Sequence, residues 1–248
     1  MNSSKIKIMS EENVAKALFK LGMPMVVSML IMALYNVVDT YFVSGLGKHS
    51  VPAVSVAFPI SLIFSGIGLT FGAGAGSYIS RLLGGEKKKE ADIVATVAMF
   101  TSVIIGAITG MTLLFLLTDV LKFMGAIPSI IEIAKKYAII FIISTMVSTA
   151  NVTAGNLAVA QGAAKVSLKA MIIGSVLNMV LDPIFIYGLN LGVNGAAIAT
   201  LISQVVTLFI YIIYFKSEKS YIKLKISNFK PTINAYKEIL KVGISMFL

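Results

Sequence analysis

Six apolar stretches, each of about 20 residues, recur along the chain, and an α-helix needs that length to cross the hydrocarbon core of a bilayer. The charged fraction is 13%, against about 25% in soluble proteins, while 57% of the residues are hydrophobic. We therefore predict an all-α polytopic membrane protein with no soluble domain. The expected spans are residues 21–44, 51–79, 91–117, 137–159, 170–187 and 195–215.

Basic residues are distributed unevenly between these spans. Alternate connecting segments, starting with the N-terminal one, hold 17 Lys and Arg residues, and the remaining segments hold 4. Because basic loops stay on the cytoplasmic side, this bias predicts a multi-pass protein of the cell membrane with its N-terminus in the cytoplasm. Orientation thus explains the net charge of +10, and we expect these charges to meet the lipid bilayer and not nucleic acid.

The side-chain inventory argues against an enzyme. The chain has no cysteine and a single histidine, which excludes disulfides, thiolate metal sites and histidine clusters. No serine nucleophile with a histidine base and no phosphate-binding glycine loop stands out. We expect no catalytic activity and no cofactor.

The last twelve residues resemble an early segment of the chain. Residues 237–248 follow the pattern of residues 16–27, with four identical pairs among twelve. This match predicts the start of a second repeat that has the same orientation as the first. We accordingly assign residues 1–217 to a six-helix lobe, 218–235 to a cytoplasmic linker and 236–248 to the start of a seventh helix. A second six-helix lobe is expected in the same chain if it extends further, and otherwise in a partner chain.

An acid lies inside the fifth apolar stretch, where a charge is costly. Insertion scales put a charged residue at the centre of a membrane helix at roughly 2.5 to 3.5 kcal/mol, so Asp182 requires partners or a function. Asn178 lies one helical turn earlier, so its amide shares a face with the carboxylate. Pro183 lacks a backbone donor and biases Asp182 away from helical geometry, which predicts a break or hinge at this point. Broken helices form ion sites at membrane depth.

A second acid, Asp39, lies in the first stretch at a matching depth. Asp39 and Asp182 are each about five residues, or roughly 8 Å, from the outer end of their spans. Tyr35 and Asn36 share a helical face with Asp39, and Thr200 lies at a similar depth in the sixth span. We interpret the two acids as a cation site. The alternative is that each acid caps a short helix near the headgroups.

Three further residues are candidates for motion or for a cavity. Pro24 interrupts the first span and is a second candidate hinge. Asn151 and Asn156 lie in the fourth span, where each either lines a cavity or bonds to a neighbouring helix.

Two other patterns predict packing and membrane position. Gly68, Gly72 and Gly76 recur every four residues and form a smooth stripe that permits close helix contact. Tyrosines near the predicted span ends suit an interfacial aromatic belt. They are Tyr78, Tyr137, Tyr187, Tyr211 and Tyr214.

These motifs together carry a family resemblance. Residues 178–186 (NMVLDPIFI) and 192–200 (GVNGAAIAT) are similar to the fifth and sixth helices of the multidrug and toxic compound extrusion (MATE) transporters. Pro24, the Asn36 to Asp39 pair with the following residues 45–47 (GLG), and residues 80–84 (SRLLG) resemble the first and second helices of that family. The resemblance covers nearly the whole chain.

The resemblance implies the N-terminal lobe of a two-lobe (6+6) secondary antiporter that exports cationic amphipathic drugs or toxins in exchange for H⁺ or Na⁺. It also implies that Asp39, Asn178, Asp182 and Thr200 form the cation site, with Na⁺ held by the two acids. Tyr35 and Asn36 would stand beside them. One departure is the segment 159–163 (VAQGA), which lacks the charged residues common there in the family.

Two alternatives remain open at this level. A lipid-linked oligosaccharide flippase of the same superfamily would share the topology, but it would need basic residues in its cavity, and no Lys or Arg lies in the core of a predicted span. A non-transporting membrane scaffold or assembly subunit would tolerate replacement of both acids.

Overall fold

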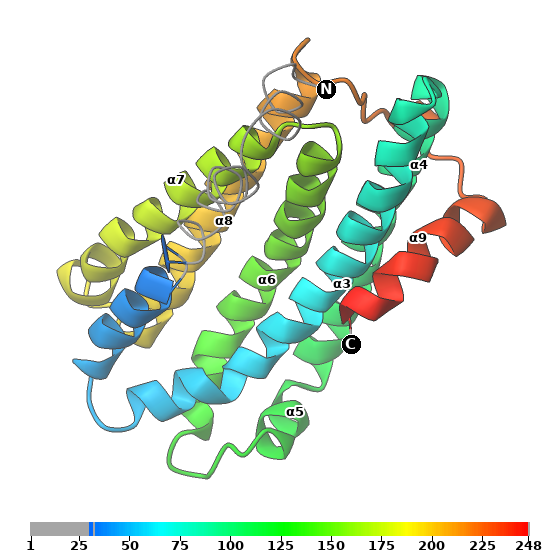
Figure 1. Ribbon diagram of the computed structural model, residues 1–248. Coiled ribbons are helices and arrows are strands. Elements are labelled where there is room, and N and C mark those ends of the chain that lie inside the picture. Colours follow the sequence, from blue (N-terminus) through cyan, green and yellow to red (C-terminus); the bar gives the residue numbers. More distant parts are fainter. Residues whose placement is uncertain (1–29, 32, 248) are drawn as a thin grey trace, which may run out of the picture.

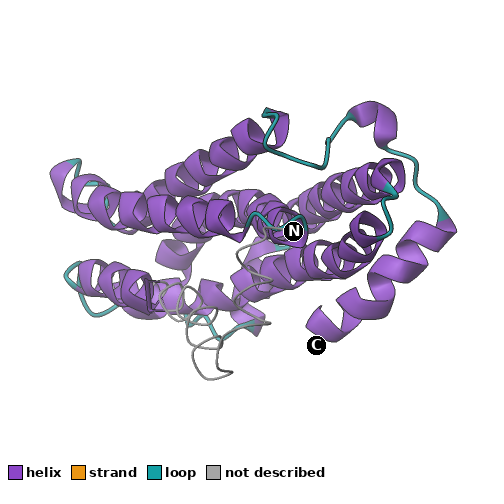
Figure 2. Ribbon diagram, turned by 45° about the horizontal axis from the view of Figure 1, so that its top comes forward, coloured by secondary structure: helices purple, strands orange, loops and turns teal. Residues whose placement is uncertain are grey.

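The computed structural model describes residues 30–31 and 33–247, and the regular secondary structure of that part is helical throughout (Figures 1 and 2). Five of these helices are long and apolar enough to cross a membrane, which confirms the predicted class. They are α3 (Ser50–Gly84), α4 (Lys88–Phe115), α6 (Ile131–Ala160), α7 with its final turn (Ala164–Gly188) and α8 (Val193–Lys216). Residues 33–44 are helical and are part of the predicted first span; Pro24 lies outside the described residues.

The helices extend beyond the apolar stretches that predict them. Helix α6 begins six residues earlier than expected, and α7 (Ala164–Pro183) begins six residues before position 170. Hydropathy marks the part of a helix that lies in hydrocarbon, whereas charged residues such as Glu132 and Lys165 are still helical in the first turn. A short helix that the hydropathy pattern did not predict, α5 (Leu117–Phe123), follows α4 directly and has Asp119 in its first turn.

The expected break at Pro183 is a change of helix type. Helix α7 runs through Asp182 to Pro183 and continues as a π-helical turn, η1 (Ile184–Gly188). The backbone N–H of Leu189 bonds to Ile184 O at 2.8 Å, five residues back. Proline removes one donor from the α-helical ladder, and the wider π register lets the chain continue without interruption.

Helix α3 packs tightly against α6 along the predicted glycine stripe. A Cβ atom on Gly68 would lie 2.8 Å from Val152 Cβ, and one on Gly72 would lie 2.9 Å from the Thr153 backbone. The close approach lets threonine hydroxyls of α6 reach backbone carbonyls of α3, with Thr153 Oγ1 donating to Gly68 O at 3.3 Å. Small residues and interhelical hydrogen bonds are the usual means of packing helices in lipid, so the prediction of close contact is confirmed.

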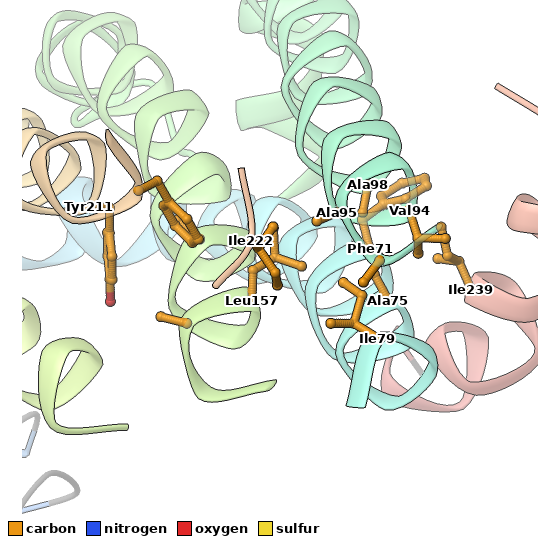
Figure 3. Packing of buried hydrophobic residues seen from close by; sticks show 14 of the residues in the cluster. Phe71, Ala75, Ile79, Val94, Ala95, Ala98, Leu157, Tyr211, Ile222 and Ile239 are labelled. Atoms are coloured by element: carbon orange, nitrogen blue, oxygen red, sulfur yellow. The ribbon is translucent and has the colours of Figure 1, made fainter. Parts of the chain in front are cut away.

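One of the two hydrophobic clusters joins α3, α4, α6 and the C-terminal helix α9 (Ile233–Phe247). Figure 3 shows Ile239 of α9 near Val94 of α4, beside Phe71, Ala75 and Ile79 of α3. Helix α9 begins three residues before the predicted start of the seventh helix, and it lies against α3 (Figure 1).

Glycines also bring α9 onto α3. A Cβ atom on Gly74 would overlap the carbonyl oxygen of Ile239, and one on Gly243 would overlap that of Thr70. Polar contacts flank this crossing, because Arg81 pairs with Glu238 at 2.8 Å and the Tyr236 hydroxyl lies 2.9 Å from Thr101 Oγ1. Arg81 therefore helps to hold α9 against α3.

The linker before α9 is attached to the turn between α6 and α7. Gln161 Oε1 accepts hydrogen bonds from the backbone N–H groups of Tyr221 (2.8 Å) and Ile222 (3.1 Å) and from the Ser220 hydroxyl (3.2 Å). Asp92 of α4 accepts one more, from the Lys223 N–H at 2.8 Å. Position 161, where the sequence departs from the family pattern, thus holds the linker in place.

We expect Gly74→Ala to destabilise the protein, because the added methyl group would overlap the α9 backbone at Ile239. Overpacking of this kind typically costs about 1–3 kcal/mol. Thermal unfolding of the purified protein in detergent measures the effect. Gly76→Ala is the matched control, since its Cβ would lie 3.5 Å from Ala160, an ordinary contact. Equal melting temperatures for the two variants would contradict the tight α3–α9 crossing.

Candidate functional site

Asp182 is fully buried near the end of α7, and its nearest partner is the amide one turn earlier. The exposed fraction is 0% for Asp182 and 2% for Asn178. The helical i, i+4 spacing places Asp182 Oδ2 3.1 Å from the Asn178 amide. The other oxygen, Asp182 Oδ1, has no hydrogen-bond partner among the described residues.

Thr200 of α8 completes this group from the neighbouring helix. Its hydroxyl lies 3.3 Å from the Asn178 amide, and it can also donate to Ala196 O at 3.0 Å in its own helix. Helix α8 can approach the end of α7 closely because Gly195 of α8 packs against the π turn. A Cβ atom on Gly195 would come within 2.6 Å of the Phe185 backbone. The π turn and Gly195 therefore position Thr200 beside Asn178.

Hydrogen bonding favours one orientation of the Asn178 amide. In that orientation Nδ2 donates to Asp182 Oδ2, and the amide oxygen accepts from Thr200. The reverse orientation would place Nδ2 against the backbone N–H of Thr200, so that two donors would meet. The amide is therefore matched to an Asp182 carboxylate that accepts a hydrogen bond.

The helix over residues 33–44 brings the second predicted acid to the same place. Asp39 lies close enough to Asp182 for the two carboxylates to interact electrostatically, and Tyr35 lies against Thr200. Asn36, the neighbour of Tyr35, is exposed. The structure therefore brings Asp39, Tyr35, Asn178, Asp182 and Thr200 together from three helical segments.

Tyr137 lies near this group of residues, a placement that sequence reasoning did not predict. It lies in α6 with 4% of its surface exposed, and it is within electrostatic range of Asp39, Tyr35 and Asp182. The span was expected to begin at residue 137, which suggested an interfacial tyrosine; because α6 begins at Ile131, Tyr137 lies about 9 Å inside the helix. The expected aromatic belt is also wrong for Tyr211 and Tyr214, which lie near the end of α8 as predicted but are buried.

A cavity of about 370 Å³ adjoins this group between α6, α7 and α8. Its polar lining consists of hydroxyls and amides, with no charged side chain among the described lining residues. These polar residues are Tyr35, Ser148, Asn151, Asn156, Ser167, Ser175, Asn178, Thr200, Ser203, Gln204, Thr207 and Tyr211.

Asn151 and Asn156 both line this cavity. Asn151 also bonds across to α8, with its Nδ2 2.7 Å from Gln204 Oε1, while Asn156 Nδ2 donates to Val152 O of its own helix at 2.8 Å. The side-chain amide oxygen of Asn151 and the Ser203 hydroxyl are buried without a partner among the described residues. The cavity therefore offers neutral hydrogen-bonding groups.

The donor set fits a hard monovalent cation or a proton. Two carboxylates, the Thr200 hydroxyl and the Asn178 carbonyl are oxygen donors, which hard cations prefer, and Asp182 Oδ1 has a free acceptor position. The described residues contain no cluster of three or more His, Cys or acidic residues, so a transition-metal centre has no counterpart in this part of the chain.

Comparison with known proteins agrees with this architecture. The MatE family pattern matches residues 24–184. The multidrug export protein MepA of Staphylococcus saprophyticus is 30% identical over 249 residues, which cover 100% of this chain and 55% of that protein; MepA of Staphylococcus aureus strain NCTC 8325 gives the same figures. The chain spans about half the length of these relatives.

Solved structures give the same result. A crystal structure of MATE in the straight conformation is 33% identical and superposes with a TM-score of 0.87, covering 100% of this chain and 55% of its own. A transporter of the MOP superfamily from Pyrococcus furiosus matches with the same identity, coverage and score. The family pattern covers most of the chain, the fold agrees, and the matched length is that of one lobe. The chain belongs to the MatE family and corresponds to the N-terminal lobe of its members.

Proposed function

We propose that this chain is the cation-coupling lobe of an antiporter that exports cationic amphipathic compounds in exchange for H⁺ or Na⁺. The observation that carries the proposal is the fully buried Asp182, which has one oxygen without a partner among the described residues and lies within electrostatic range of Asp39. A pair of acids in an apolar interior is costly unless a cation or proton occupies it.

The family and its named relatives support this assignment. As a member of the MatE family the chain is a transport protein and not an enzyme, and MepA is named a multidrug export protein. The cavity beside the acids has no described charged lining, which suits an amphipathic cation better than an anionic lipid phosphate. The length of the relatives supports a second lobe as the partner, in the same chain or in another.

Coupling follows from the hydrogen bond between Asn178 and Asp182. A proton on Asp182, or a cation bound at Asp39 and Asp182, competes for the carboxylate oxygen that accepts from Asn178, and Tyr35, beside Thr200, passes that change to the first helix. A ligand shifts a two-state equilibrium only if it binds the two states differently, so the proposal requires the cation to bind more tightly in one state of the first helix than in the other. Pro24 and Pro183 are the proposed points of bending, and the N-terminus is proposed to be cytoplasmic.

Replacement of both acids tests the proposal. We expect the double substitution Asp39→Asn with Asp182→Asn to remove gradient-driven export, lowering its stimulation by about 5- to 150-fold, the usual range of a coupling free energy. The measurement is transport of a fluorescent organic cation by the complete transporter in vesicles, with an imposed H⁺ or Na⁺ gradient. Asp119→Asn, in the short helix α5, is the control. Full gradient-driven export by the double variant would refute the coupling role.

The Thr200 hydroxyl has a separable effect. Thr200→Val keeps the shape of the side chain but removes the group that binds the Asn178 amide, so we expect the apparent affinity for the coupling cation to fall roughly 2- to 10-fold. Thr112→Val is the matched control, because Thr112 is exposed on α4 and bonds only within its own helix, to Ile108 O. The half-saturating cation concentration of transport distinguishes them, and equal values for both variants would show that Thr200 is not part of the site.

A further inference from the structure

The helix over residues 33–44 ends with a carbonyl that its own backbone does not satisfy. The N–H of Leu46 would close an α-helical bond to Phe42 O, but it bonds to Val43 O at 3.1 Å. The next N–H, of Gly47, bonds to Ser44 O at 3.3 Å. Helix ends leave such carbonyls to other partners.

The partner of the Phe42 carbonyl is a tyrosine from the π turn. The Tyr187 hydroxyl donates to Phe42 O at 2.5 Å across 145 residues of sequence. The two aromatic rings also meet edge to face, with their centroids 6.2 Å apart. A hydrogen bond and a ring contact thus join the same two residues.

Gly45 completes the contact from the other side. A Cβ atom at this position would overlap the Tyr187 hydroxyl oxygen, while it would stay 3.4 Å from the ring carbon Cζ that carries the hydroxyl. The φ angle of Gly45 is not in the left-handed region. The space for the hydroxyl, and not backbone conformation, is therefore what requires glycine here.

This contact lies next to the candidate cation site. Phe42 follows Asp39 by three residues, or about one helical turn, and Tyr187 follows Asp182 by five residues. The contact therefore ties together the two segments that carry the acids, just beyond the acids themselves.

We infer that Tyr187 is a positioning residue that holds Asp39 at a fixed distance from Asp182. Gly45 leaves the space that the Tyr187 hydroxyl occupies. The inference rests on the proposed cation site. The hydrogen bond fixes one end of the helix over residues 33–44. When a cation binds, this helix then moves about Phe42, and the distance between the two acids is kept.

Removal of the hydroxyl is the first test. In the complete transporter, we expect Tyr187→Phe to raise the half-saturating concentration of the coupling cation roughly 2- to 10-fold, the effect of one hydrogen bond, with little change in the maximal rate. Tyr41→Phe is the matched control, since Tyr41 lies on the same helix and 71% of its surface is exposed. An equal and unchanged half-saturating concentration in both variants would overturn the inference.

The space beside Gly45 provides a rescue test. Gly45→Ala alone is expected to displace the Tyr187 ring and weaken apparent cation affinity more than Tyr187→Phe does. In the double variant Gly45→Ala with Tyr187→Phe, the new methyl group fills the space that the hydroxyl left, so its apparent affinity should return to that of Tyr187→Phe alone. Additive losses of apparent cation affinity in the double variant would show that the two positions act independently. They would contradict the inference that Gly45 makes room for the Tyr187 hydroxyl.

A distance measurement separates this inference from the transport function. Spin labels on cysteines introduced at the exposed positions Val37 and Val180 report the separation of the two acid-bearing segments, and the chain has no cysteine of its own. We expect Tyr187→Phe to broaden the distance distribution and Tyr41→Phe to leave it unchanged. This result would support the positioning role even if the protein showed no coupling to a cation gradient. An unchanged distribution in Tyr187→Phe would refute it.

Discussion

The cost of keeping a carboxylate in an apolar interior governs this lobe. Asp182 is fully buried, and the Asn178 amide at i, i+4, held by Thr200 of the next helix, lowers that cost. The first helix brings a second acid, Asp39, whose like charge raises the cost again unless a cation or proton is bound. The close approach of α8 at Gly195 and the π turn after Pro183 make those contacts geometrically possible. A fold selected only for packing would have no need for these arrangements.

Much of this architecture could be predicted from the sequence, because its strongest signals are local. Stretches of apolar residues indicate membrane helices, and the i, i+4 spacing places Asn178 beside Asp182 without knowledge of the fold. The glycine stripe of α3 likewise indicates close contact, although not that α6 is the helix it contacts. The pairing of Asp39 with Asp182 was predicted from depth alone and agrees with their electrostatic proximity.

Other features escaped prediction because they depend on neighbours distant in sequence. Tyr137 was assigned to the membrane interface, since hydropathy shows where a helix is apolar and not where it begins. Pro183 indicates a disturbance in the helix, but the choice between a break and a π turn depends on how α8 packs against it. The match to residues 16–27 predicted the start of helix α9, but its contacts with α3 are visible only in three dimensions (Figure 1).

The attachment of the linker to Gln161 has a consequence for its behaviour in different solutions. A single amide oxygen holds two backbone N–H groups and one hydroxyl, so this connection contains no ion pair. Salt screens charges and pH titrates them, whereas a neutral amide acceptor is insensitive to both. In a relative with charged residues at this turn, ion pairs between the turn and the linker would weaken as ionic strength rises. In this chain the hydrogen bonds between Gln161 and the linker should persist at high and at low ionic strength alike.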